Sequence, residues 1–270
     1  MQDVDLRVLF LLRGAADRWP QLDAFLDLLV SNEVLKAGPV LVAIWALWFV
    51  RDAKTDDRRI GIVSLLIAGC SAAIFSVCLT RVLPMRLRPV FEPSLSSAFS
   101  MPQIAPDWAR VSSLPSDHAA LFIALACGLT FVSRRWGLLL LLHAVLFVLL
   151  PRAFIGLHYF WDLMAGALIG VTFAWLGSSD WVRTRISAPL VRFEASHAPA
   201  FYGVMFALTM QIAELFHGSR EVLGLLSRAG AALVHGIRVG PNYQAVLELL
   251  MLFAVVACVA LVLRHRRKVG

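Results

Sequence analysis

The sequence predicts an all-α protein, a polytopic transmembrane helical bundle. Of its 270 residues, 59% are hydrophobic and only 16% are charged, against about 25% charged residues in ordinary soluble domains. Apolar runs long enough for an α-helix to cross roughly 30 Å of hydrocarbon recur along the chain. They stand at 34–50, 60–80, 119–133, 137–157, 160–177, 200–217 and 245–263. We therefore expect about six or seven transmembrane helices.

The first 30 residues alternate short apolar runs with arginine, aspartate and proline. This pattern favours amphipathic helices at the membrane interface over a span. The acidic Asp3 and Asp5 also stand where a signal peptide would carry positive charge. We predict an interfacial segment at 1–32, a helical core at 33–180 that carries the function, and a C-terminal extension at 181–270 with two further transmembrane helices.

The net charge of +7 comes from basic residues at the ends of the apolar runs and in the tail RHRRK. Anionic lipid headgroups and the positive-inside rule explain this distribution better than a nucleic-acid partner, which we do not expect. With the loops at 51–59, 134–135 and 178–199 and the C-terminus in the cytoplasm, that side holds 13 of the 25 Lys and Arg residues. Without Arg81, Arg88 and Arg152, which we assign to a functional site below, the division is 13 against 9 and favours this orientation.

Three polar clusters then share the outer face, each at the end of an apolar run. Their sequences are RVLPMRLRP after the run at 60–80, SSLPSDHAA before the run at 119–133, and PRAFIGLHYFWD at 151–162. Polar groups near a bilayer are costly, so their concentration at one end of the spans indicates a functional site.

The residue types in these clusters point to phosphoryl transfer. Several arginines that converge on one place suit the planar, bidentate binding of a phosphate, and a helix start at PSDH adds donors and a positive dipole end. His158 and Asp162 are four residues apart, so on a helix the carboxylate can fix the imidazole tautomer. A second histidine, His118, can protonate a leaving group. An anion cradle, a nucleophile and a general acid are the parts that such a reaction needs.

The three clusters resemble the ordered motifs of the type 2 phosphatidic acid phosphatase (PAP2) superfamily. The matching residues are Arg81-x6-Arg88-Pro89, Pro115-Ser116-Asp117-His118 and Arg152-x5-His158-x3-Asp162. The resemblance covers about residues 30–177 and implies a bundle of the PAP2 type around a catalytic core.

The resemblance also implies the role of each residue. His158 is the nucleophile that forms a phosphohistidine, Asp162 orients it, and His118 protonates the departing lipid oxygen. The phosphate is held by Arg81, Arg88, Ser116 and Arg152, with Asp117 beside it in place of the usual glycine, and neither a metal nor another cofactor is needed. The PSDH form is similar to the bacitracin-resistance type of undecaprenyl pyrophosphate phosphatase, so a polyprenyl diphosphate is the first substrate that we expect.

The sequence therefore predicts a lipid phosphatase of a bacterial inner membrane, with lipids as its partners and its site facing the periplasm. A lipid phosphotransferase that uses the same phosphohistidine remains an alternative, as does a non-enzymatic lipid-binding or transport protein. A homo-oligomer also remains open. We interpret Arg86, Arg110, Arg134 and Arg135 as interface anchors, and Glu33 and Lys36 as an i,i+3 pair.

Overall fold

The computed structural model describes residues 2–16, 19–95, 99, 109 and 111–214, and the regular elements within this part are all helices. This confirms the predicted all-α class. The span expected at 245–263 and the anchor Arg110 lie outside the described residues. The helices are α1 Gln2–Ala16, α2 Pro20–Ser31, α3 Glu33–Phe49, α4 Thr55–Val82, η1 Pro89–Phe91, α5 Asp117–Val132, α6 Arg134–His143, η4 Ala144–Leu149, α7 Leu150–Phe154, α8 Phe160–Gly177, α9 Asp180–Val182, η5 Arg183–Ser187, α10 Ala188–Ser196 and α11 Ala198–Ala213.

Three described helical stretches are long and apolar enough to cross a bilayer: Thr55–Val82, Arg134–Phe154 and Phe160–Gly177. A fourth span results if the bent pair Gln21–Ser31 and Glu33–Phe49, which meet at 56°, counts as one. The predicted spans at 119–133 and 200–217 correspond to α5 and α11, which are apolar but shorter. Length and composition therefore support three or four spans in this part of the chain, fewer than the number expected from the apolar runs.

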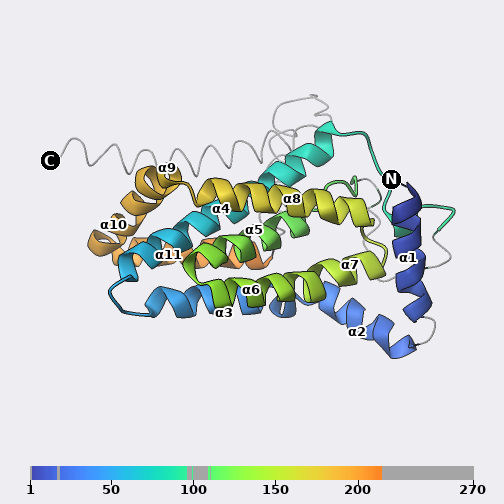
Figure 1. Cartoon of the computed structure of the whole chain (residues 1–270), viewed down its shortest axis with the longest axis horizontal. Coiled ribbons are helices and arrows are strands. Elements are labelled where there is room, and N and C mark those ends of the chain that lie inside the picture. The colour runs from blue at the N-terminus through green and yellow to red at the C-terminus, as the bar shows by residue number, and fades with distance from the viewer. Residues whose placement is uncertain (1, 17–18, 96–98, 100–108, 110, 215–270) are drawn as a thin grey trace, which may run out of the picture. The chain divides into compact units, whose positions relative to one another are not determined.

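The centre of the bundle consists of α4, α5 and α8, which pack along one another (Figure 1). Small residues let their backbones come close. A Cβ atom at Gly166 of α8 would lie 2.3 Å from the Ser116 carbonyl oxygen, so only glycine fits there. This close approach brings the start of α5 against the start of α8.

Two features shape the end of the bundle at which α7 ends and α8 begins. The helical stretch at 134–154 is π-helical at η4, continues as α7, which contains Pro151, and ends in the loop at 155–159. Gly156 of this loop has a φ of +81°, a left-handed conformation that favours glycine. The amphipathic α1 lies across this end, against α7 and α8 (Figure 1).

The chain divides into two compact units, Met1–Met205 and Phe206–Gly270. Residues 181–205 thus pack with the first unit, where Ser187 shares a 2.7 Å hydrogen bond with Ser64 of α4 and Glu194 pairs with Arg59 at 2.9 Å. The boundary at 180, which was placed by motif coverage, stays a prediction.

Candidate active site

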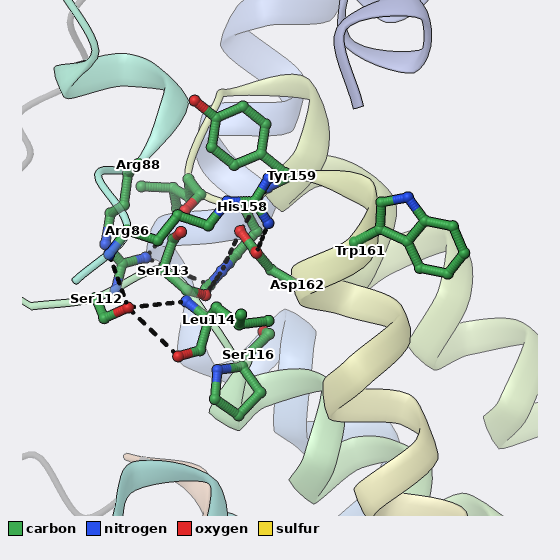
Figure 2. A network of polar contacts seen from close by, with 12 residues as sticks. Arg86, Arg88, Ser112, Ser113, Leu114, Ser116, His158, Tyr159, Trp161 and Asp162 are labelled. Atoms are coloured by element: carbon green, nitrogen blue, oxygen red, sulfur yellow. Dashed lines mark hydrogen bonds and ion pairs between the residues drawn. The ribbon is translucent and has the colours of Figure 1, made fainter. Parts of the chain in front are cut away.

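The three motifs meet between the end of α4, the start of α5, the end of α7 and the start of α8. The backbone N–H of Ser116 donates to the Asp162 carbonyl oxygen at 3.1 Å, which ties the second motif to the third. The Ser116 hydroxyl accepts from the Ala119 N–H at 3.4 Å and so caps α5. Figure 2 shows residues of all three motifs around His158.

The His158 side chain is buried, and both ring nitrogens have polar neighbours. Nδ1 lies 2.9 Å from the Ser113 carbonyl oxygen, and Nε2 lies 3.3 Å from the Arg88 guanidinium (Figure 2). Because a carbonyl oxygen can only accept, Nδ1 must carry the proton. In the neutral ring the lone pair is then on Nε2, which faces the guanidinium.

The charge state of His158 follows from its surroundings. Burial, together with the positive charges of Arg88 and Arg152, holds the pKa of His158 well below its ordinary value of 6.5. The ring is therefore neutral at pH 7, and Nε2 carries the lone pair that a nucleophile needs.

Asp162 does not hold the imidazole in the way that its i,i+4 spacing predicts. Its Oδ2 lies 3.9 Å from Nδ1, too far for a hydrogen bond, and accepts instead from the Tyr159 N–H at 2.8 Å. Its other oxygen pairs with Arg86. The spacing rule assumes that both residues lie on one helix, but His158 precedes α8, which begins at Phe160. Asp162 therefore fixes the loop and the helix start, and a backbone carbonyl sets the tautomer.

The second histidine has the carboxylate partner that the first lacks. Asp117 Oδ1 accepts from the backbone N–H of His118 and lies 2.8 Å from its Nδ1. The sequence places Asp117 among the phosphate-binding residues, but this oxygen is engaged with the imidazole. A carboxylate at Nδ1 stabilises an imidazolium, and a protonated His118 would have its Nε2–H free to donate, as a general acid requires.

The arginines of the motifs differ in burial. Arg88 is buried and donates to the Leu157 carbonyl oxygen at 3.1 Å. Arg152 is 2% exposed, and its Nε has no hydrogen-bond partner within the described part of the chain. A buried guanidinium with an unused donor is suited to an anion. Arg81, in the last turn of α4, is exposed, so its place at the phosphate stays a prediction.

Two basic residues that the sequence did not assign to the site, Lys36 and Arg86, also lie in this region. Lys36 is 2% exposed, pairs with Glu33 at 2.8 Å as predicted, and lies close enough to Arg152 and Asp117 to interact electrostatically. The interpretation of Arg86 as an interface anchor is wrong, because its guanidinium bridges Asp162 and Asp5. The signal in the sequence was a carboxylate at Asp5, on the same face of α1 as the buried Leu9.

No group of three or more His, Cys, Asp or Glu side chains in the described part of the chain is arranged to hold a metal ion. The positive charge at the site comes from arginine and lysine side chains.

The family model of the PAP2 superfamily matches residues 61–186, a range that contains all three motifs. No curated protein and no solved structure matches the chain.

Proposed function

We propose that this protein is an integral membrane phosphatase of lipid phosphates, because residues 61–186 match the PAP2 superfamily, which includes phosphatases. The observation that carries the proposal is the neutral, buried His158, whose Nε2 faces Arg88 at 3.3 Å. A nucleophilic nitrogen next to a guanidinium is the arrangement that attack on an anionic phosphoryl group requires.

In the first half-reaction, His158 Nε2 attacks the phosphorus atom. The N–P bond forms as the bond between phosphorus and the lipid oxygen breaks, and His118 Nε2–H transfers its proton to that oxygen. Arg88 and Arg152 neutralise the charge on the phosphoryl oxygens, while Nδ1–H keeps its hydrogen bond to the Ser113 carbonyl. The product is a phosphohistidine and a free lipid alcohol, or a lipid monophosphate from a diphosphate.

In the second half-reaction, water attacks the phosphohistidine. His118, now neutral, accepts a proton from the water as the new P–O bond forms and the N–P bond breaks. Inorganic phosphate leaves, and both histidines return to their starting states. A phosphotransferase would replace this water with the hydroxyl of a second lipid, so the two activities share the first half-reaction.

We propose a polyprenyl diphosphate as the first substrate to test. Lys36 supports this choice, because it adds an ammonium group near Arg152, and two linked phosphates carry more negative charge than one. Asp117 gives weaker support than the sequence suggested, since it binds His118. Purified protein should release phosphate from a polyprenyl diphosphate faster than from phosphatidic acid, phosphatidylglycerol phosphate or lipid A. Release from none of the four would contradict the proposed function.

The arrangement of charge favours an enzyme over a transporter. The motif residues lie at one end of the bundle, at the end of α4, the start of α5, the end of α7 and the start of α8. A transport path would instead distribute ionisable groups along the spans and break helices near the midplane.

Replacing Arg152 with lysine is expected to lower kcat/KM by about 100-fold, because a point charge cannot reproduce the bidentate contact of a guanidinium. Inhibition by vanadate, which mimics the phosphoryl group, should weaken in parallel. The matched control is Arg185→Lys, at an exposed arginine of η5. Wild-type activity and vanadate inhibition in Arg152→Lys would mean that this arginine is only an interface anchor.

We propose that the site opens toward the periplasm of a bacterial inner membrane. In a variant without the four native cysteines, a cysteine at the exposed Ser94 should react with a membrane-impermeant maleimide on intact spheroplasts. A cysteine at Asp56, in the first turn of α4, should react only after permeabilisation. The reverse pattern would overturn the orientation.

A further inference from the structure

The buried carboxylate of Asp5 connects the N-terminal helix to the candidate site. Asp5 is 2% exposed, although it lies on α1, whose Phe10 and Leu11 are exposed. Its Oδ2 accepts from Arg86 at 2.5 Å, and its Oδ1 accepts from the Trp161 N–H at 3.1 Å in the first turn of α8. Both oxygens are thus bound to the catalytic core.

Arg86 connects Asp5 to two segments, one through its side chain and the other through its backbone. Its guanidinium reaches Asp162, which caps α8 at the Tyr159 N–H, and it stacks 4.1 Å from the centre of the Tyr159 ring. Its backbone carbonyl accepts from the Ser113 N–H at 2.9 Å.

Each segment lies next to His158. Ser113 is the residue whose carbonyl oxygen binds Nδ1, and Tyr159 is the residue that follows His158 in the chain. Arg86 therefore holds the segment at 112–113 by its backbone carbonyl and the start of α8 by its guanidinium, and both adjoin His158 (Figure 2).

From this network we infer that Asp5 is a positioning residue for His158, and that α1 belongs to the catalytic apparatus. Asp5 holds Arg86 in the orientation that keeps the Ser113 carbonyl at Nδ1 and the Nε2 lone pair toward the phosphate. The inference rests on the proposed function for the role of His158 as nucleophile. Two buried carboxylates, Asp5 and Asp162, are costly to desolvate even with Arg86 between them, and the alignment of one imidazole accounts for their presence.

A purely mechanical role of Asp5, in which it only attaches α1, makes different predictions. Loss of an attachment lowers the free energy of unfolding and leaves the imidazole of the folded protein unchanged. Loss of positioning changes kcat and the state of the His158 ring, because a displacement of about 1 Å at a reacting group can cost about 100-fold in rate.

The test compares Asp5→Asn with Asp3→Asn, a substitution at an exposed carboxylate of the same helix. The full-length protein is placed in lipid nanodiscs, and two quantities are measured. One is kcat and KM for the lipid phosphate that the wild type hydrolyses. The other is the ¹⁵N spectrum of labelled histidine, in which the His158 signals are assigned by their loss in His158→Gln.

We expect kcat of Asp5→Asn to fall by about 10- to 100-fold with KM within about threefold of wild type, and its His158 signals to change from a single Nδ1–H tautomer to a mixture. Asp5→Glu should recover part of kcat and of the tautomer, and Asp3→Asn should match wild type. Wild-type His158 signals in Asp5→Asn would overturn the inference, whatever happens to the unfolding temperature.

The spectrum also separates this inference from the proposed function, because the tautomer can be measured even if no lipid phosphate is hydrolysed. If Asp5→Asn does not fold, Arg86→Lys serves in its place, since one ammonium cannot bridge two carboxylates with the geometry of a guanidinium. A wild-type tautomer in folded Arg86→Lys would contradict the positioning role equally.

Discussion

Replacing His158 with alanine is expected to lower kcat by about 10⁴-fold or more, the scale of loss when a covalent nucleophile is removed. The expectation rests on two contacts: the Ser113 carbonyl fixes the proton on Nδ1, and the Arg88 guanidinium lies 3.3 Å from Nε2. No other side chain described around this guanidinium has that pair of contacts. Phosphate release from the preferred lipid measures the effect.

The control is His197→Ala, at an exposed histidine that stacks on Phe193 at the end of α10. It should retain wild-type activity. The lowered pKa of His158 adds a pH dependence, because protonation would remove the nucleophile only well below pH 6.5. Activity should therefore persist when the pH is lowered past 6.5. A His158→Ala variant with more than about a tenth of wild-type kcat would exclude this residue as nucleophile.

Replacing His118 with alanine is expected to cost about 10²- to 10⁴-fold in kcat for a lipid monophosphate, the range for loss of a general acid. The reason is the poor leaving group: an alkoxide needs a proton as its bond to phosphorus breaks. An aryl phosphate, whose leaving group is a much weaker base, should lose less than about tenfold. Rates for the two substrate types in wild type and variant measure the difference.

Asp117→Asn provides a matched test of the same contact, because it keeps an oxygen near His118 Nδ1 but removes the charge that stabilises the imidazolium. It should show the same dependence on leaving group with a smaller loss. Equal losses for alkyl and aryl phosphates in His118→Ala would show that His118 acts in binding and not as the acid.

The sequence predicted the individual helices better than their number of crossings. The run at 160–177 corresponds to α8, Phe160–Gly177, because an uninterrupted apolar stretch bounded by polar residues leaves little choice. The start of α5 was harder to predict from the sequence. Hydropathy does not show that the polar segment before α5 ends in an N-cap at Ser116. The bend of 56° between α2 and α3 depends on Asn32, which accepts from the Leu35 N–H and starts a new helix.

The sequence also predicted one part of the candidate site and not another. Motif spacing predicted that His118, His158, Arg88 and Arg152 belong to one site, because the sequence specifies the side chains and their order. The acceptor at His158 Nδ1 is a backbone carbonyl, which every residue has, so no pattern points to Ser113. The partners of Arg86 were also hidden, since Asp5 is far away in the chain and only the packing of α1 on α8 brings the two together.

The central claim, covalent catalysis by His158, is tested most directly by trapping the intermediate. Purified protein is mixed with a lipid whose reacting phosphate is radiolabelled, and the reaction is stopped with alkali within one turnover. We expect label on the protein that is stable to alkali and labile to acid, as a phosphohistidine is, and that is absent from His158→Ala. Turnover at the wild-type rate in His158→Ala, or phosphate release by direct attack of water with no labelled protein, would contradict the account.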